Sequence, residues 1–394
     1  MTETRARPVP AATGRPWWAT ALLGAGVIAL CYGFARYAYG LFVPRFTEAF
    51  ALGPVAVGVL GGLSTTGYVL GLLAAPLLSA RSARGSTVAA GLAATAGLLA
   101  MALAPGVAVF AAGIVVAGSG AGLASPGVAQ LVVETVGRAD RGRAQTWANT
   151  GTGAGLALTA SAPLLPGDWR PVWLGFALLA AATTAVTAWL LRRAGTGPDP
   201  GVAGPAGPPA AGRAGGTGAL LLGAALLGAV SAPYWTFSTT RLAEAGVGPL
   251  VATAAWGAIG LVGLLGGAAG RAVERHGLRA VGLVVWTAWS AGIALLALPA
   301  PGVAGALVSA GLFGTGYMAL TGLCILWAAR LFPASPARGV TRAFLALGVG
   351  QTAAAPLAGA LAGQIGLGAT FAVTGAAGLL AWTQLHPRLA PPAD

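Results

Sequence analysis

The side chain with the clearest chemical potential in this sequence is Arg36, which stands inside an apolar stretch that runs from Trp17 to Val43. A guanidinium inside a membrane helix costs about 2.5 to 3.5 kcal/mol on insertion scales, and its planar fork of N–H groups matches a carboxylate or a similar anion. We therefore interpret Arg36 as an anion clamp. A structural role stays open, in which the guanidinium pairs with backbone carbonyls or a hydroxyl, or reaches the membrane interface along its aliphatic stem.

Two tyrosines are spaced to accompany this arginine. Tyr32 precedes Arg36 by four residues and Tyr39 follows it by three, so both share its face of an α-helix. We predict that their hydroxyls act beside Arg36 in a binding site. Packing of the two rings between helices is the alternative.

The positions of the acidic residues restrict the chemistry further. There are nine, and every one lies near the end of an apolar stretch, in a connecting segment or in a tail. The apolar stretches therefore offer no buried carboxylate as a proton relay. No Walker phosphate loop, metal-ligand cluster or Ser/His/Asp set appears, and His276 and His386 both fall outside the apolar stretches. We expect no enzyme, no cofactor and no metal site.

Composition defines the elements that must position these side chains. Of 394 residues, 56% are hydrophobic and 8% are charged, with a mean hydropathy of +0.79. A soluble domain carries about 25% charged residues, so a soluble fold is excluded. The apolar residues come in blocks of about 20, enough for a helix to cross a hydrocarbon core of about 30 Å. We therefore expect an all-α membrane protein.

The apolar blocks predict twelve transmembrane helices in two pseudo-symmetric six-helix bundles. We expect spans near residues 18–44, 55–79, 86–104, 107–135, 144–165, 172–192, 218–241, 250–270, 280–299, 303–330, 341–363 and 367–385. Residues 193–217 are rich in Gly and Pro and predict a linker. It separates a first bundle at 1–192 from a second at 218–394.

The basic residues predict the orientation of the chain. All 22 are arginine, and they contribute to a formal charge of +13. If the N-terminus is cytoplasmic, eighteen of them face the cytoplasm, three (Arg45, Arg170 and Arg241) face outward, and Arg36 is in the membrane. This asymmetry follows the positive-inside rule. It places both termini in the cytoplasm. It also explains the positive charge by orientation in the membrane, so the charge does not indicate binding to nucleic acid.

The two predicted bundles repeat one another at an offset of about 195 residues. The segment Arg45-Phe-Thr-Glu48-Ala49 after span one returns as Arg241-Leu-Ala-Glu244-Ala245 after span seven. Parallel repeats of this kind are typical of secondary transporters, because two similar bundles can rock around a central site. The repeat therefore favours a transporter over a channel or a membrane enzyme.

The loop after span eight carries a motif that resembles the major facilitator superfamily. That family's loop reads Gly-x-Leu-Ala-Asp-Arg-x-Gly-Arg-Lys, and Gly270, Glu274, Arg275, Gly277 and Arg279 match it. The loop after span two keeps Arg81 and Arg84 but has Pro76, Ala80 and Ala83 in place of Gly, Asp and Gly. The stretch Gly33-Phe-Ala-Arg36-Tyr-Ala-Tyr39 is similar to a signature of the bacterial YbfB-type branch, with Ala35 replacing its second glycine.

The resemblance implies a central cavity lined by spans one, four, seven and ten, with partners for Arg36 in the second bundle. It points to Tyr234, Trp235, Ser238, Thr315, Tyr317 and Thr321, and we add Gln351 and Thr352 of span eleven and residues 64–68 of span two. Helix packing, with hydroxyls bonded to their own backbone, is the alternative for each. We interpret Gly118, Gly120 and Gly122 of span four as close helix packing or a bend.

The loop arginines and Glu274 predict a gate at the cytoplasmic side. Pseudo-symmetry places Glu274 near the start of span five, where helix amides and Arg143 are positive. Arg81, Arg84, Arg275 and Arg279 accompany it in the two loops. In the alternative, Glu274 neutralises Arg271 or Arg275 of its own loop.

Together these features predict a secondary transporter that moves a small organic solute, preferably an anion, by alternating access. The alternatives are a proton-coupled exporter of drugs or metabolites and a membrane sensor that kept the fold. Export of cationic drugs is disfavoured, because span five lacks the Gly-Pro-x-x-Gly-Gly ending and span four lacks the family's arginine. We expect a monomer in the cell membrane whose partners are the bilayer and its solute, without nucleic acid.

Overall fold

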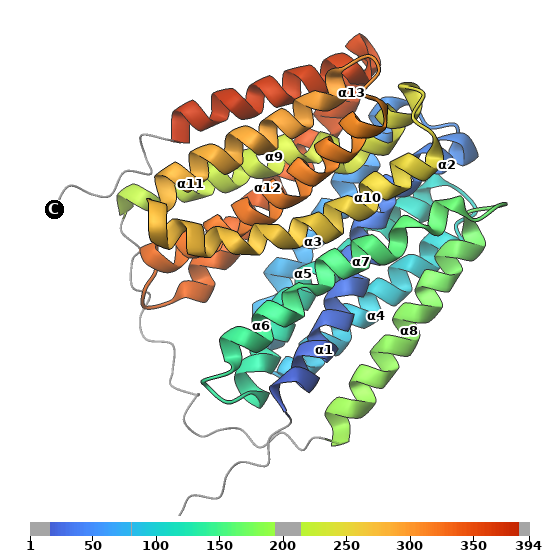
Figure 1. Ribbon diagram of the computed structural model, residues 1–394. Helices are drawn as coiled ribbons and strands as arrows, with labels where there is room; N and C mark the ends of the chain where they lie inside the picture. Colours follow the sequence, from blue (N-terminus) through green and yellow to red (C-terminus); the bar gives the residue numbers. More distant parts are fainter. Residues whose placement is uncertain (1–15, 80, 194–213, 386–394) are drawn as a thin grey trace, which may run out of the picture.

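The computed structural model describes residues 16–79, 81–193 and 214–385, and this part of the chain is helical without any strand (Figure 1). The predicted linker at 193–217 lies mostly outside the described residues. The elements are α1 (Trp17–Ile28), η1 (Ala29–Tyr37), α2 (Ala38–Phe50), α3 (Pro54–Ser79), α4 (Ala83–Ala102), α5 (Val107–Thr135), α6 (Arg141–Asn149), α7 (Gly151–Ala160), η2 (Ala162–Leu164), α8 (Arg170–Arg193), α9 (Ala214–Glu244), α10 (Pro249–Gly263), η3 (Leu264–Ala268), α11 (Ala269–Ala294), η4 (Leu295–Ala297), α12 (Gly302–Leu331) and α13 (Pro336–Leu385).

Nine helical segments of the described residues are long and apolar enough to cross a membrane. Two of them, Pro249–Ala297 and Pro336–Leu380, each contain two of the spans predicted from the sequence. They are interrupted at Gly277 (φ 78°) and Gly366 (φ 80°), a backbone region that glycine enters at little cost. The predicted fifth span is divided between α6, α7 and η2 and is not one of the nine.

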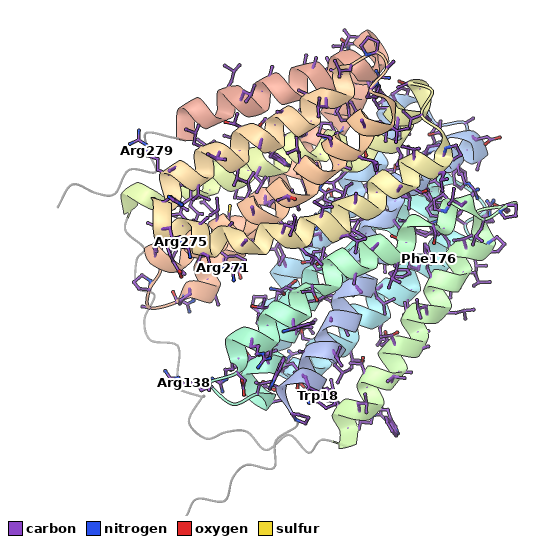
Figure 2. All side chains as sticks on the ribbon, in the orientation of Figure 1. Trp18, Arg138, Phe176, Arg271, Arg275 and Arg279 are labelled. Atoms are coloured by element: carbon purple, nitrogen blue, oxygen red, sulfur yellow. The ribbon has the colours of Figure 1, made fainter. Side chains whose placement is uncertain are left out.

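The helices form two groups that lie side by side in Figure 1. Residues 17–193, from blue to green, form the first half, and residues 214–385, from yellow-green to red, form the second half. Arg138 follows α5 of the first half, and Arg271 and Arg275 belong to α11 of the second half; we call the end that they mark the arginine-rich end. The two halves diverge toward this end (Figures 1 and 2).

Contacts between the halves gather in the middle of the molecule and toward the opposite end. The Thr239 hydroxyl of α9 donates a hydrogen bond of 2.6 Å to the Gly40 carbonyl of α2. A Cβ atom at Gly40 would collide with the Trp235 carbonyl oxygen, and one at Gly58 of α3 with the Ala355 carbonyl oxygen of α13. Glycine therefore allows the two halves to meet backbone to backbone, as small residues do between membrane helices.

Glycines of α5 bring together the helices of the first half. A Cβ at Gly118 or Gly122 would overlap carbonyl oxygens of α3, those of Ser64 and Tyr68. On another face of α5, Gly120 lies against Ala90 and Ala94 of α4. The predicted close packing of this glycine cluster is confirmed.

The repeated arginines Arg45 and Arg241 have equivalent structural roles. Arg45 donates hydrogen bonds to the carbonyls of Pro163 (2.6 Å) and Leu165 (2.9 Å), at the end of η2. Arg241 donates to the carbonyls of Leu296 (2.9 Å) and Leu298 (2.7 Å), at the end of η4. Each arginine thus satisfies carbonyls that a helix end leaves without intrahelical partners.

Replacing Arg241 with Ala should lower the thermal stability of the protein. The side chain is 7% exposed, and its loss leaves two carbonyls unsatisfied, each at a cost of about 1 to 3 kcal/mol. We expect the midpoint of thermal unfolding in detergent to fall by several degrees. The control is Arg275→Ala, which removes an exposed arginine. Equal midpoints for the two variants would contradict this role.

Candidate functional site

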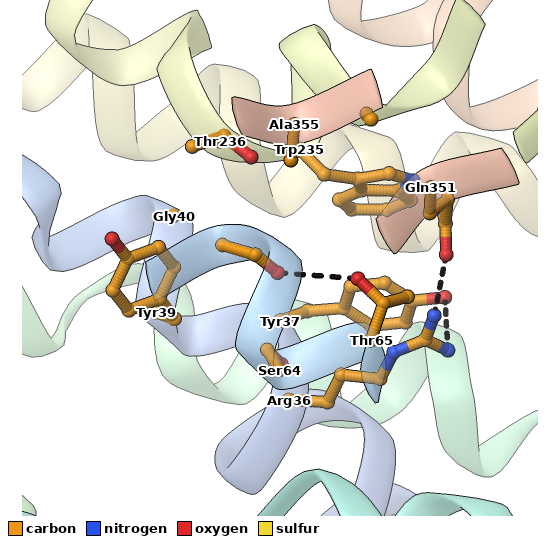
Figure 3. Close-up of a pocket in the computed structure, with 12 residues that line it drawn as sticks. Arg36, Tyr37, Tyr39, Gly40, Ser64, Thr65, Trp235, Thr236, Gln351 and Ala355 are labelled. Carbon is orange, nitrogen blue, oxygen red and sulfur yellow. Dashed lines mark hydrogen bonds between the residues drawn. The ribbon is translucent and has the colours of Figure 1, made fainter. Parts of the chain in front are cut away.

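Arg36 lies in η1, a nine-residue π-helical segment between α1 and α2. It is 6% exposed and donates hydrogen bonds to Gln351 Oε1 (2.6 Å) and to Tyr37 Oη (3.3 Å) (Figure 3). The ion pair found among the described residues is Arg170 with Asp168. Among the described residues, the groups that contact this buried cation are the amide of Gln351 and tyrosine side chains, which are neutral.

Three tyrosine rings of the first half face the guanidinium. Its carbon lies 4.0 Å from the ring centroid of Tyr68, 5.0 Å from that of Tyr37 and 5.8 Å from that of Tyr32. Rings within about 6 Å attract a cation through their negative faces, by about 2 kcal/mol when the pair is desolvated. The rings thereby offset part of the cost of burying Arg36 and leave its outer N–H groups for hydrogen bonds.

The π-helix explains why Tyr37 was absent from the sequence prediction. Consecutive residues of an α-helix do not face each other, so the residue after Arg36 gave no signal. In η1 its ring and hydroxyl both meet Arg36. Segments of π-helix are rare and often occur at functional sites.

Gln351 of α13 links Arg36 to the second half. Its amide nitrogen donates to Ser231 Oγ of α9 (3.1 Å) and to Tyr317 Oη of α12 (3.4 Å), while its oxygen accepts from Arg36. Ser231 Oγ in turn donates to the carbonyl of Gly228 (2.9 Å). Three helices of the second half therefore fix the orientation of one amide group.

Trp235 of α9 covers the same site from the second half. Its ring stacks on Tyr37 at 4.1 Å between centroids and meets Tyr317 edge-on at 5.3 Å. The indole Nε1 is buried and has no hydrogen-bond partner among the described residues. An unsatisfied buried donor is costly, and a bound acceptor is one way to satisfy it.

A cavity of about 40 Å³ borders Arg36 between the two halves. It is lined by η1, α2 and α3 of the first half and by α9 and α13 of the second half (Figure 3). The hydroxyl-bearing residues Ser64, Thr65 and Thr236 line it together with Tyr39 and Trp235. The cavity combines a cation, hydroxyls and aromatic walls.

The hydroxyl groups of three other predicted binding residues bond to protein groups other than Arg36. Tyr39 lines the cavity, but its hydroxyl donates to the Val57 carbonyl (2.9 Å), because η1 rotates the following helix out of the expected register. Tyr234 bonds to Ser309 (3.0 Å) and stacks on Phe313 at 3.8 Å. Tyr32 bonds to Ser125 (2.9 Å).

Four further hydroxyl residues belong to the predicted set, and one of them, Thr352 of α13, has a buried Oγ1 without a hydrogen-bond partner among the described residues. Thr321 donates to carbonyls of its own helix, and Thr315 donates to the Val262 carbonyl of α10 (3.1 Å). Ser238 is buried in α9. Of the predicted residues, Arg36, Tyr32, Tyr68, Trp235, Tyr317 and Gln351 thus meet around one point. Tyr39, Ser64 and Thr65, which were also predicted, line the adjoining cavity.

The predicted gate residues surround the arginine-rich end without a bond between Glu274 and Arg143. Glu274, Arg275, Arg279 and Arg81 are exposed, and Arg84 is half-buried. The guanidinium carbon of Arg143 lies 4.2 Å from the ring centroid of Trp17. In Figure 2, Arg138 of the first half is well separated from Arg271 and Arg275 of the second half.

The fold is shared with solved transporters of low sequence identity. A bacterial homolog of the human lysosomal transporter Spinster, in an inward-facing and unoccupied conformation, matches with a TM-score of 0.69 and 15% identity over 96% of this chain and 100% of that chain. The nucleoside transporter NupG matches with a TM-score of 0.71 and 12% identity over 94% and 99%. The xylose transporter XylE from E. coli, inward open, gives 0.72 and 15% over 94% and 96%.

The sequence itself matches a family of transporters over most of its length. No curated protein matches the chain. Residues 28–385 match the family described as "Uncharacterised MFS-type transporter YbfB". This range contains η1, the cavity and both halves of the described structure. The chain therefore belongs to the major facilitator superfamily, in its YbfB-type family, and is a multi-pass membrane transporter.

Proposed function

We propose that the protein is a secondary active transporter that moves a small organic anion across the membrane by alternating access. The observation that carries this proposal is Arg36, a cation that is 6% exposed and has no carboxylate partner among the described residues, beside a cavity between the two halves. A carboxylate of the solute would supply the missing charge and fit the guanidinium fork. Intramembrane charges of this kind mark solute pathways.

The same proposal places the residues of the solute site in both halves. Arg36, Tyr32 and Tyr39 belong to the first half, and Tyr234, Trp235, Ser238, Tyr317, Thr321 and Gln351 belong to the second. Because the site is shared, rocking of one half against the other changes its geometry, and solute binding can favour one state.

Twelve membrane spans in two six-helix bundles complete the proposal. Gly277 and Gly366 would each separate two spans, and α6, α7 and η2 would form another. The bundles would be residues 1–192 and 218–394, joined by the linker at 193–217. With the arginine-rich end in the cytoplasm, both termini are cytoplasmic, as the positive-inside rule requires. The protein would act as a monomer in the inner membrane of a bacterium.

The conformation described here fits a state open toward the cytoplasm. Contacts between Gly40 and Thr239 and between Gly58 and Ala355 join the halves away from the arginine-rich end. At the arginine-rich end the halves diverge (Figure 1). Two of the similar solved structures are inward-facing or inward open, which supports the same assignment.

A thermal-stability screen of the purified protein tests the proposed class of solute. A ligand that binds the folded state raises the unfolding midpoint by mass action, so a set of mono- and dicarboxylates should contain stabilising compounds. Matched cations and neutral amides should not stabilise. Stabilisation by cations alone would favour an exporter of cationic compounds, and stabilisation without flux in proteoliposomes would favour a sensor.

Replacing Glu274 with Gln should shift the protein further toward the cytoplasm-open state. We propose that Glu274 pairs with the start of α6 and with Arg143 when the arginine-rich end closes, because the N-terminal amides of a helix attract an anion. Loss of that charge should increase labelling of a cysteine placed in the cavity by a reagent on the cytoplasmic side.

The control for this experiment is Glu134→Gln, which removes an exposed carboxylate at the end of α5. If labelling is the same in the Glu274→Gln variant and in the parent, Glu274 serves only to neutralise arginines of its own loop.

A further inference from the structure

The bond between Arg36 and Gln351 joins two residues that are 315 positions apart, one in each half. The distance between Arg36 Nη2 and Gln351 Oε1 is 2.6 Å, and a hydrogen bond from an ionised donor is stronger than one between neutral groups. It lies at the centre of the proposed pathway. Any rocking of the halves that moves α13 away from η1 must break it.

The orientation of Gln351 presents its oxygen, rather than its nitrogen, to the guanidinium. The amide nitrogen donates to Ser231 Oγ and to Tyr317 Oη. Ser231 Oγ uses its own hydrogen toward the Gly228 carbonyl, so it can only accept from the amide. The amide oxygen of Gln351 thus takes the position on Arg36 that one oxygen of a bound carboxylate would take.

Arg36 has capacity for a stronger partner than this amide. A guanidinium has five N–H donors, and the structure uses two of them, toward Gln351 and Tyr37. The adjacent cavity of about 40 Å³ holds about three water-sized groups, because one water needs about 10 to 15 Å³. A carboxylate has three heavy atoms, so the volume of the cavity matches that group.

We propose that Gln351 is a stand-in for the solute carboxylate: it holds Arg36 and joins the two halves in the empty protein, and an entering anion displaces it. This inference rests on the proposed transport of anions. Solute binding then exchanges a bond between the halves for a bond between Arg36 and the solute. The displaced amide frees α13 to move relative to η1, which couples binding to rocking.

If the solute displaces Gln351 from Arg36, removing the Gln351 side chain should tighten the binding of carboxylates to the protein. Replacing Gln351 with Ala removes the competitor of the anion, and a bond to a charged group contributes enough to change affinity about tenfold. We expect the apparent affinity for a stabilising carboxylate to rise about tenfold. Gln351→Glu should instead pair with Arg36 permanently and abolish stabilisation by carboxylates.

The experiment uses the full-length protein in detergent and titrates acetate, lactate and benzoate while thermal unfolding is followed. Gln351→Met keeps the side-chain volume and serves if the Ala variant does not fold. The matched control is Gln145→Ala in α6, which removes an amide that bonds to Asn149 (3.0 Å), away from the cavity.

A second measurement gives the distance between the two halves in the absence of a ligand. Spin labels on cysteines at the exposed positions Arg138 and Arg271, in a background with Cys31 and Cys324 replaced, report the distance between the arginine-rich ends. We expect Gln351→Ala to broaden the distance distribution of the empty protein and Gln351→Glu to narrow it.

The outcomes distinguish failure of the proposed role of Gln351 from failure of the proposed function. Tighter carboxylate binding in Gln351→Ala, with a broader distribution, supports the stand-in. Weaker or equal binding overturns it and makes Gln351 an ordinary ligand or a bystander, while carboxylate binding by the parent still supports the proposed function. If no carboxylate stabilises the parent or the Ala variant, both proposals fail, even where the distance distribution changes.

Discussion

Proteoliposomes with the Arg36→Ala variant should take up none of the organic anion that the unaltered protein carries. Arg36 is the buried cation of the site, and two hydrogen bonds from it to a carboxylate contribute about 1.5 to 3 kcal/mol each. Their loss reduces affinity by at least about a hundredfold. The measurement is the initial rate of uptake over a range of solute concentrations.

A second substitution separates charge from shape at the same position. Lys keeps the positive charge but lacks the planar fork, so Arg36→Lys should retain uptake with an affinity about tenfold lower. The unfolding midpoint of each variant shows whether it is folded. Normal transport by a folded Arg36→Ala protein would return Arg36 to a structural role among its three tyrosines.

Replacing Gly40 with Val should prevent the halves from meeting away from the arginine-rich end. A Cβ at this position collides with the Trp235 carbonyl oxygen and lies 3.0 Å from the Trp256 ring. Overpacking of this kind costs about 1 to 3 kcal/mol, which reduces the population of the described state about five- to 150-fold. We expect a strong fall in transport rate.

The conformational part of this effect can be measured directly. The labelling uses a background in which Cys31 and Cys324 are replaced and a single cysteine stands at Thr236, in the cavity wall. In the Gly40→Val variant this cysteine should react faster with an impermeant maleimide added outside the cell than it does without that substitution. Gly53→Val is the matched control, because a Cβ at Gly53 meets nothing within 4 Å. Equal labelling of the Gly40 and Gly53 variants would show that this packing does not seal the pathway.

The sequence predicted the membrane-spanning character of the chain and drew attention to Arg36, because both depend on local composition. An arginine in an apolar stretch is conspicuous wherever the helix packs, and the helical spacing correctly placed Tyr32 near it. The family could also be recognised from the sequence, because Gly270, Glu274 and Arg275 keep the motif of its loop.

The partners of Arg36 were harder to predict from the sequence, because they depend on packing between distant segments and on an irregular helix. Gln351 was one of several polar residues in the second half, and nothing in its neighbours indicates that its oxygen meets Arg36 from 315 residues away. In the π-helical segment η1, the Tyr37 hydroxyl accepts from Arg36, whereas the Tyr39 hydroxyl, which the α-helical spacing placed beside Arg36, donates to the Val57 carbonyl. Ser231 gained its role only through Gln351.

Uptake of a radiolabelled carboxylate by proteoliposomes, compared with uptake of its neutral amide, tests the central claim most directly. The solute is one that stabilises the purified protein, and the same vesicles are prepared with Arg36→Gln. We predict saturable uptake of the carboxylate by the unaltered protein, none of the amide, and none of either solute by the variant. Uptake of the amide at the same rate, or carboxylate uptake that persists in a folded Arg36→Gln protein, would contradict transport through an anion site at Arg36.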